Sequence, residues 1–368
     1  MDVALAVADG PVTAAGVFTR NLVRAAPVFV AEERLRGGTA RGVLVNAGCA
    51  NACTGEPGHR AVLDSTGAVA EALGAAAGEL VPASTGVIGQ LLPAQKIAAR
   101  AGELVQKLSP EGIDDFALAI CTTDRWPKVA EAELAGGARL LGIGKGAGMI
   151  HPDVGPPQAT MLVFLFTDAV VDRAELAAAL YAASDRTFNA CSVDGDTSTN
   201  DSVVVLASGA SGVRVGRAEL EAKLTDVCGT LARSMVRDGE GSEHMIEIKV
   251  TGLPTDDEAR TIARTIATSL LVKTALYGRD ANWGRLLGAA GRAGVRFDPA
   301  QARIAIAGVE IVKSGLAVGP AAEAEAQRGM AEENFAVEIG LGSGPGSFSY
   351  FTSDLGHGYV DVNASYRS

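Results

Sequence analysis

The stretch at residues 145–168 carries the residues whose types and spacing best suit covalent chemistry. A glycine-rich turn with one lysine precedes a loop rich in proline, and Ala159-Thr160 then opens an apolar run of the length of a buried strand. The Thr160 hydroxyl could attack the carbonyl before it and cut the chain, which would leave one residue with both a nucleophile and a basic α-amine. An ordinary strand start explains the Ala-Thr pair as well, so the stretch alone leaves both interpretations open.

Three more groups of polar residues follow predicted strands or helices. Thr85-Gly86 sets a side-chain hydroxyl beside a backbone N–H, the two donors of an oxyanion hole, although an ordinary turn is the simpler explanation. Thr122 follows a predicted strand at residues 116–120, where a hydroxyl is well placed to line a pocket. Glu240 stands between two glycines after a predicted helix, either as an accessible carboxylate or as a solvated acid at the helix end.

The charge and hydropathy of the chain exclude two classes of partner. The formal net charge is −11 over 368 residues, and no basic stripe is present to neutralise phosphates. The same acidity disfavours an anionic membrane surface, and no apolar run reaches the length of a spanning helix. We therefore expect neither a nucleic-acid nor a membrane partner. The opening residues lack a basic segment, so we expect no signal peptide and a cytoplasmic location.

The cysteines and histidines give no metal or disulfide pattern. The five cysteines are an odd number without the spacing of a disulfide framework, which indicates reduced, buried thiols. Cys49 and Cys53 are four apart, but no second pair follows, so zinc is not expected. The four histidines are scattered, and we expect them at the surface or in loops.

The apolar periodicities predict a mixed-sheet α/β or α+β fold with two lobes rather than a doubly wound one. Residues 194–201 are predicted to form a structured turn, because the spacing of an EF-hand is missing. The predicted strands are residues 3–7, 13–19, 42–46, 116–120, 161–166, 203–206, 246–250, 304–306, 309–311, 335–341, 347–351 and 359–362. The predicted helices include residues 62–73, 97–108, 175–180, 220–235 and 262–270.

Many separate blocks of this sequence resemble, in order, the glutamate N-acetyltransferase / ornithine acetyltransferase family of arginine biosynthesis. The blocks are AGVFTRN at residues 15–21, NAG-ANACTG at 46–55, ASTGVIG at 83–89, TTD-PK at 122–128, KGAGM-P-ATML at 145–162, DGDTSTNDSV at 194–203, DGEG at 238–241, VKTAL-G-D-NWGR at 272–285 and the closing DL-GYV-N-SY. One such block would be weak, whereas the ordered set spans nearly the whole chain.

This resemblance implies a fold and an assembly. The family fold is an α/β/β/α sandwich of the ornithine acetyltransferase / N-terminal-threonine aminopeptidase type, built from two fragments of one chain. Residues 1–159 would form the alpha fragment with the oxyanion hole, and residues 160–368 the beta fragment that begins with Thr160. Two alpha and two beta fragments would assemble into a heterotetramer.

The resemblance also implies the roles of individual residues. Cleavage would fall between Ala159 and Thr160, Thr160 would be the nucleophile, and Thr85 with Gly86 would form the oxyanion hole. Substrate would be bound by the residues at the family's other motif positions, which are Thr122, Lys145, Thr160, Glu240, Asn363 and Ser368.

The implied reaction moves an acetyl group from N2-acetylornithine to glutamate through an acetyl-Thr160 intermediate, giving ornithine and N-acetylglutamate. Lys145 is the candidate partner of the substrate carboxylate, and Glu240 that of the ornithine δ-ammonium. The reaction needs no metal and no cofactor. The sequence leaves open whether acetyl-CoA is a second donor, so that the enzyme would also be an amino-acid N-acetyltransferase.

Two departures from the family pattern keep other interpretations in view. The loop before Ala159 is four residues longer than usual and contains Pro156-Pro157, which bears on self-cleavage, and the opening strand of the family is expected to be missing. The alternatives are a self-cleaving N-terminal-threonine hydrolase or aminopeptidase, and an uncleaved, non-catalytic paralogue. A phosphate cradle at residues 144–148 lacks the required spacing.

Overall fold

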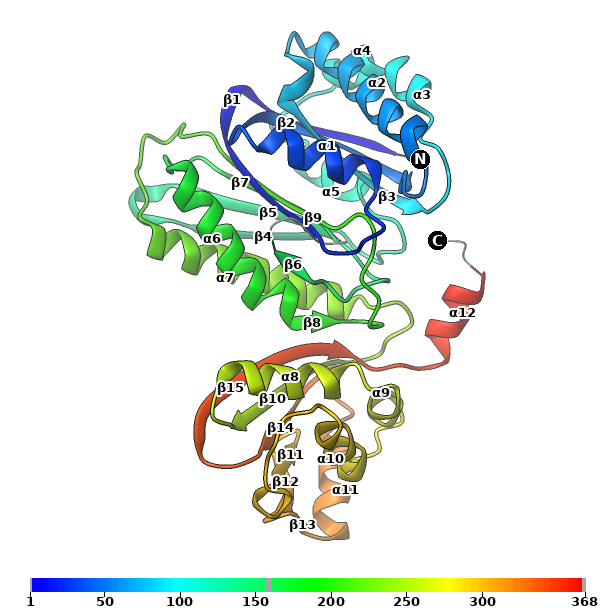
Figure 1. The fold of residues 1–368 in the computed structure, drawn as a ribbon, viewed down its shortest axis with the longest axis vertical. Helices are drawn as coiled ribbons and strands as arrows, with labels where there is room; N and C mark the ends of the chain where they lie inside the picture. The colour runs from blue at the N-terminus through cyan, green and yellow to red at the C-terminus, as the bar shows by residue number, and fades with distance from the viewer. Residues whose placement is uncertain (1, 156–160, 366–368) are drawn as a thin grey trace. The chain divides into compact units, whose positions relative to one another are not determined.

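The computed structural model describes residues 2–155 and 161–365, which form two compact units (Figure 1). The first unit holds the described residues up to Asn189 together with Asp196–Met235. The second holds Ala190–Gly195 together with the described residues from Val236 onward. The predicted fragments 1–159 and 160–368 follow from a covalent cut rather than from compactness, so this division does not test them.

A mixed sheet forms the centre of the first unit, with the order β3-β2-β1-β9-β7-β5-β4 and β6 paired to β1. Its described strands are β1 (Val3–Thr19), β2 (Thr39–Cys49), β3 (Leu80–Val87), β4 (Lys128–Glu133), β5 (Arg139–Lys145), β6 (Val154–Gly155), β7 (Leu162–Thr167) and β9 (Ser202–Ala207). The helical segments are α1 (Ala26–Leu35), α2 (Gly55–Leu73), η1 (Ala77–Glu79), α3 (Ala94–Ala98), α4 (Ala101–Gln106), α5 (Ile113–Ala119), η2 (Ala135–Gly137), α6 (Arg173–Arg186), η3 (Phe188–Ala190) and α7 (Arg217–Arg237).

Helices cover both faces of this sheet, and alternate residues of its strands pack into the hydrophobic cores on the two faces. Val43 and Val45 of β2 pack with α1 and α5, whereas Leu44 between them packs with α2, α3 and α4. Helix α7 lies against the same face as Leu44, since its Val227 and Leu231 fill the space above Gly142 of β5. The central strand β7 is therefore apolar on both faces, as a run of buried residues predicts.

Strand β1 joins two predicted strands into one. The segments at residues 3–7 and 13–19 are continuous, and the pairing with β2 shifts register between Val7 and Val12. Such a shift bends a strand without ending it. The second half of β1 then pairs with β9, the strand that also flanks β7.

The second unit contains a mixed sheet with the order β13-β12-β11-β14-β10-β15-β8. Its described strands are β8 (Cys191–Ser192), β10 (Met245–Gly252), β11 (Arg303–Ile306), β12 (Val309–Lys313), β13 (Leu316–Ala317), β14 (Asn334–Gly340) and β15 (Gly344–Ser353). Its helical segments are α8 (Asp256–Ala267), α9 (Leu270–Tyr277), α10 (Trp283–Gly291), η4 (Pro299–Gln301), α11 (Pro320–Gly329) and α12 (His357–Ser365).

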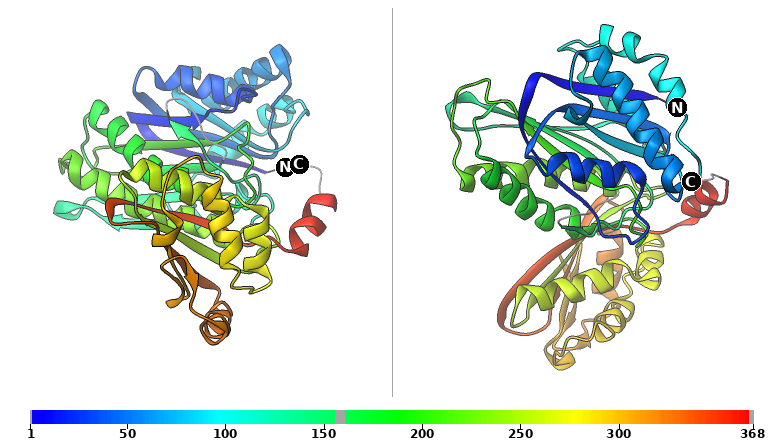
Figure 2. Two further views of the ribbon diagram at one scale, coloured as in Figure 1. Left: turned by 60° about the horizontal axis from the view of Figure 1, so that its bottom comes forward. Right: turned by 45° about the horizontal axis from the view of Figure 1, so that its top comes forward.

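One face of this second sheet carries its helices, as Figure 2 shows for the yellow segments against the orange and red strands. Ile246, Ile248 and Val250 of β10 are fully buried in one core with α8, α10 and α11, and the residues between them, Glu247 and Lys249, are only partly covered. This alternation is the predicted half-buried strand. Thr255 and Glu258 form a complete capping box that fixes the start of α8.

The mixed α/β class predicted from the sequence is confirmed, whereas two predicted strands are wrong. Residues 116–120 lie in and just after helix α5, with Phe116, Ala117 and Ile120 buried and Leu118 64% exposed. Residues 359–362 lie in helix α12. Both are segments of only four or five residues, in which periodicity alone does not separate a strand from a helix. The helix predicted over residues 97–108 is divided into α3 and α4, and that predicted over residues 262–270 is divided between α8 and α9.

The histidines and cysteines differ in part from the expectation. His151 and His244 lie in loops as expected, although both are buried and His244 contacts Asp354, whereas the half-buried His59 lies in helix α2. Cys49, Cys191 and Cys228 are buried as expected, whereas Cys53 is exposed.

Candidate functional site

The predicted oxyanion pair lies inside strand β3 rather than in a turn. Thr85 and Gly86 pair in parallel with Ala47 and Gly48 of β2. Gly86 has φ +124°, and a Cβ atom there would lie 2.4 Å from the backbone carbon of Gly48. Only glycine fits this position, because any side chain would collide with backbone. The close approach of two strands at facing glycines thus fixes the direction of the backbone beside the Thr85 hydroxyl.

Lys145 at the end of β5 brings three predicted site residues together. Its buried Nζ atom donates a hydrogen bond of 2.8 Å to the Thr122 hydroxyl and one of 3.3 Å to the Thr85 hydroxyl. Thr85, Thr122 and Lys145 come from separate segments of the chain, yet their polar atoms converge on one ammonium group. The sequence predicted the members of this cluster but not their contacts.

Asp124 holds this ammonium in place. Its fully buried carboxylate lies 2.7 Å from the Lys128 Nζ atom and 3.7 Å from that of Lys145. It also accepts hydrogen bonds from the backbone N–H groups of Gly146, at 2.7 Å, and Thr122, at 3.1 Å. Burial alone would raise the pKa of Asp124, but the two lysines and these hydrogen bonds hold that pKa well below its usual range. Asp124 is therefore a carboxylate at any physiological pH.

The loop at residues 194–201 supports the oxyanion strand. The Asn200 amide donates hydrogen bonds to the carbonyl oxygens of Ala50, at 2.7 Å, and Ser84, at 2.8 Å. The Ser84 hydroxyl in turn donates to the Asn46 side chain at 2.6 Å. The prediction of a structured turn is confirmed, and its amide reaches beyond the turn to the residue directly before Thr85.

Glu240 and Asn363 meet in the second unit. The Asn363 amide donates a hydrogen bond of 2.9 Å to the Glu240 carboxylate. Gly241, with φ +66°, lies against the backbone of Gly358, where an added Cβ would be 2.1 Å from the carbonyl carbon. Glycine after Glu240 thus lets the chain touch helix α12, which carries Asn363.

Proteins of known sequence match the chain from end to end. The sequence model of the ArgJ family covers residues 1–368. The chain belongs to the ArgJ family. It is 46% identical over 374 residues to the arginine biosynthesis bifunctional protein ArgJ of Nitratidesulfovibrio vulgaris, covering 100% of this chain and 94% of that protein. It is 42% identical over 377 residues to the protein of the same name from Geobacter sulfurreducens, covering 100% and 95%.

A crystal structure of an ArgJ protein from Bacillus halodurans is also similar, with a TM-score of 0.53 and 40% identity. The match covers 98% of that solved chain but 55% of the present one. The suspected resemblance to the ornithine acetyltransferase family is thus confirmed over the whole length of the chain.

Three predicted site residues fall outside the described part of the chain, namely Ala159, Thr160 and Ser368. The residue after Thr160 is described. Met161 is fully buried, and its carbonyl oxygen accepts a hydrogen bond of 2.7 Å from the Ser202 N–H. Leu162 then pairs with Lys145 across β7 and β5. The first residues described after the predicted cleavage point therefore lie beside the strand end that carries Lys145.

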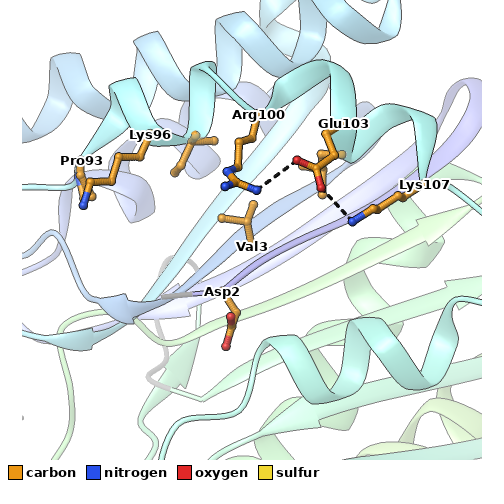
Figure 3. A pocket seen from close by; sticks show the side chains of 9 residues that line it. Asp2, Val3, Pro93, Lys96, Arg100, Glu103 and Lys107 are labelled. Carbon is orange, nitrogen blue, oxygen red and sulfur yellow. Dashed lines mark hydrogen bonds and ion pairs between the residues drawn. The ribbon is translucent and has the colours of Figure 1, made fainter.

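A surface pocket of about 630 Å³ lies elsewhere in the first unit (Figure 3). The start of β1 and the helices α3 and α4 line it, and two of its cations, Arg100 and Lys107, are paired with Glu103 at 3.1 and 2.8 Å. Among the described residues, this lining includes no predicted site residue.

Two findings on metals and membranes concern the described residues only. In residues 2–155 and 161–365, no group of three or more His, Cys, Asp and Glu side chains is placed to hold a metal ion. Nor does the described part of the chain contain a helix long and apolar enough to cross a bilayer.

Two supporting residues of this ArgJ chain were not assigned a role from the sequence. Asp124 stood in the polar stretch that contains the predicted pocket residue Thr122, and Asn200 stood in the predicted structured turn. A carboxylate followed four residues later by Lys128, next to the predicted pocket residue Thr122, was the available signal for Asp124. Nothing in the sequence pointed to the strand that Asn200 supports, because that contact spans more than one hundred residues.

Proposed function

We propose that this chain cleaves itself before Thr160 and then carries an acetyl group from N2-acetylornithine to glutamate on the Thr160 hydroxyl. The chain is an acetyltransferase of arginine biosynthesis by its membership of the ArgJ family. The match over residues 1–368, with the motif residues in place, is the observation that carries the proposal.

The first step is the activation of the nucleophile. The Thr160 hydroxyl attacks the Ala159 carbonyl, the peptide bond becomes an ester, and water hydrolyses the ester to a carboxylate on Ala159 and a free amine on Thr160. The solved Bacillus halodurans chain supports this step, because 98% of it is matched by 55% of the present chain, so that it is shorter than the present chain, as a cleaved fragment would be.

The transfer follows the logic of a threonine nucleophile with its own amine as base. The amine takes the hydroxyl proton while the Thr160 oxygen attacks the acetyl carbonyl of N-acetylornithine. The tetrahedral oxyanion is held by the Thr85 hydroxyl and the Gly86 N–H, each of which is worth about 10²–10³ in rate at such a site. Ornithine leaves with the proton. The glutamate amine then attacks the acetyl ester and departs as N-acetylglutamate.

Lys145 serves this oxyanion hole in addition to the carboxylate that the family resemblance assigns to it. Because the Lys145 ammonium donates to the Thr85 oxygen, the Thr85 hydrogen remains available for the substrate oxyanion. The positive charge also makes that hydroxyl a stronger donor. The Asp124 carboxylate, 3.7 Å from the Lys145 ammonium, holds it in position. Thr122 shares the same ammonium and completes the cluster.

Glu240 and Asn363 are proposed to bind the amino-acid part of the substrate. Glu240 is proposed to bind the δ-ammonium of ornithine, and the hydrogen bond from Asn363 orients the carboxylate for that contact. Ser368 is assigned to substrate binding by the family motif alone. The relatives are named bifunctional, which supports acetyl-CoA as a second donor to glutamate, with no bound cofactor.

The assembly and location are also proposals. We propose a heterotetramer of two alpha and two beta fragments, acting on small molecules in the cytoplasm. Size measurement together with denaturing electrophoresis of the purified protein tests this assembly. Two pairs of fragments support it, and a single pair of fragments contradicts it.

One assay separates this transferase from its alternatives. Purified protein is supplied with N-acetylornithine carrying a labelled acetyl group, with and without glutamate. Label in N-acetylglutamate supports the transferase. Label released mainly as acetate in the presence of glutamate supports a threonine hydrolase instead. An uncut chain that binds N-acetylornithine without either product supports the non-catalytic paralogue.

A further inference from the structure

A fully buried lysine lies in the second unit, apart from the proposed oxyanion cluster. Lys273 of helix α9 is 2% exposed, and its ammonium donates hydrogen bonds to the Thr352 hydroxyl at 3.0 Å, the Ser353 hydroxyl at 3.2 Å and the Ser353 carbonyl oxygen. All three acceptors lie at the end of β15. Burying an ammonium costs several kcal/mol after relaxation, whereas an apolar side chain of similar size would pack here without that cost. The position of this lysine therefore calls for a reason beyond packing.

The acceptors of Lys273 belong to the connecting segment, which we define as residues 352–357, from the last two residues of β15 to the first residue of α12. The Leu355 N–H donates to the Lys273 carbonyl at 3.3 Å. One turn further along α9, the Tyr277 ring lies against Gly356, where an added Cβ would be 2.1 Å from it, and contacts the His357 ring edge-on. Helix α9 thus holds both ends of the connecting segment, and this segment delivers the helix that carries Asn363.

The connecting segment also holds the backbone that follows Glu240. The Asp354 carboxylate accepts a hydrogen bond of 3.0 Å from the Glu243 N–H, and its other oxygen lies 2.7 Å from Nδ1 of His244. Asp354 and His244 are each 2% exposed. Both residues of the Glu240–Asn363 pair are therefore attached, over a few residues of chain, to one buried polar network.

We propose that Lys273 is a positioning residue that sets the Glu240–Asn363 pair for the substrate ammonium group, acting through the connecting segment and Asp354. This inference rests on the proposed binding of ornithine by Glu240. Loss of the amine would leave the connecting segment without its three hydrogen bonds to α9. The pair would then move relative to the substrate, while the oxyanion cluster of the first unit would be unchanged.

The charge state of Lys273 gives this role a pH signature. Burial lowers the pKa of Lys273 to about 7, and the carboxylates of Asp354 and Asp194 oppose that decrease. Among the described residues, the titratable groups around the amine are these two carboxylates and His244, which contacts Asp354. Above pH 7 the neutral amine keeps two donors for its three acceptors. We therefore expect the KM for N-acetylornithine to rise as the pH passes through about 7.

The test compares Lys273→Met with wild-type enzyme in steady-state kinetics across the pH range 6 to 9. We expect KM for N-acetylornithine to rise about tenfold at neutral pH, in line with the sensitivity of rates to small displacements, and KM for glutamate to change less than about twofold. The inflection near pH 7 should be lost. Lys249→Met, at a partly exposed lysine of β10 that pairs with Glu338, is the matched control and should behave as wild type.

Three outcomes would overturn the inference. If Lys273→Met has an unchanged KM for N-acetylornithine and this KM still shows the inflection near pH 7, Lys273 has no role in positioning. If the KM values for N-acetylornithine and glutamate both rise by the same factor and the melting temperature falls, Lys273 has a general structural role. If Lys273→Met does not fold, Asp354→Asn takes its place, and an unchanged N-acetylornithine KM in that variant contradicts the network. Wild-type enzyme that transfers no acetyl group would instead refute the proposed function itself, so the two failures are distinguishable.

Discussion

The Lys145 ammonium donates a hydrogen bond of 3.3 Å to the hydroxyl oxygen of Thr85, and this contact leaves the Thr85 hydrogen for another acceptor. A cation behind an oxyanion donor strengthens that donor without touching the substrate oxygen. Asp124, Lys145 and Thr85 thus form a charged network that acts on the proposed oxyanion donor. Single substitutions in this network should have different effects on kcat, KM and stability.

Lys145→Met should reduce kcat by about 10²-fold, because the oxyanion donor loses its polarising cation. A smaller increase in KM for N-acetylornithine should accompany it, from the contact with the substrate carboxylate. Steady-state kinetics on the cleaved enzyme measure both constants, and the exposed Lys96→Met serves as the control. An increase in KM at unchanged kcat would limit Lys145 to carboxylate binding.

Asp124→Asn should be more damaging to stability than any exposed acid-to-amide change. It leaves two buried lysines without their carboxylate, which typically costs about 3–5 kcal/mol. Urea unfolding of the variant beside Asp114→Asn, at an exposed acid of α5, measures the difference. Equal stability of the two variants would show that the lysines find other partners.

The same carboxylate predicts a pH dependence. Because the folded-state pKa of Asp124 lies below the ordinary value of 3.8, its contribution is complete above that pH and is lost as the pH falls below it. Unfolding curves at several acidic pH values should therefore show a smaller loss of stability for Asp124→Asn than for the wild type. Parallel losses in the two proteins would contradict the assignment.

Gly86→Ala should abolish most activity, since the added Cβ would lie 2.4 Å from the Gly48 backbone at a φ of +124°. The strands must separate, and the oxyanion N–H moves with them. Gly67→Ala is the matched control, because nothing lies within 4 Å of that position in helix α2 and alanine stabilises a helix by about 0.5–1 kcal/mol. Acetyl-transfer rates and melting temperatures of both variants check this prediction. A Gly86→Ala enzyme with wild-type activity would contradict the role of the Gly86 N–H as an oxyanion donor.

Lys273 predicts a second dependence of stability on pH, in the same direction as that of Asp124 but in an alkaline window. Its folded-state pKa is about 7 against an ordinary 10.5, so the unfolded chain binds more protons between these values. Stability should therefore rise with pH across this window, by at most about 1.4 kcal/mol per pH unit from this group. The rise should be smaller in Lys273→Met. Urea unfolding between pH 7 and 10 tests it, and an identical slope in the variant would speak against a low pKa.

The sequence predicted those parts of the site that are encoded in local motifs. Thr85, Gly86, Thr122, Lys145, Glu240 and Asn363 were all named from short blocks of residues. Their grouping was not predictable, because a hydrogen bond such as that between Lys145 and Thr85 depends on strands β3 and β5 lying in one sheet. Asp124 and Lys273 were missed for the same reason. Each acquires its role from burial, and burial of a charged side chain is not visible in a local pattern.

The fold was predictable in class and in most of its strands. Long periodic segments such as α7 and strongly alternating ones such as β10 appeared as predicted. The errors at residues 116–120 and 359–362 concern segments of only four or five residues, where tertiary packing decides between a strand and a helix. The two compact units could not be placed from the sequence, since the second takes residues 190–195 from the middle of the first.

The most direct test of the account is the intact mass of the denatured protein after incubation with N-acetylornithine and no acceptor. The account predicts two chains, residues 1–159 and 160–368, with the second heavier by one acetyl group that disappears when glutamate is added. Thr160→Ala should remain a single chain of 37.4 kDa without the added mass. A wild-type protein that stays whole, or fragments that never carry an acetyl group, would contradict the claim that Thr160 is the acetyl carrier.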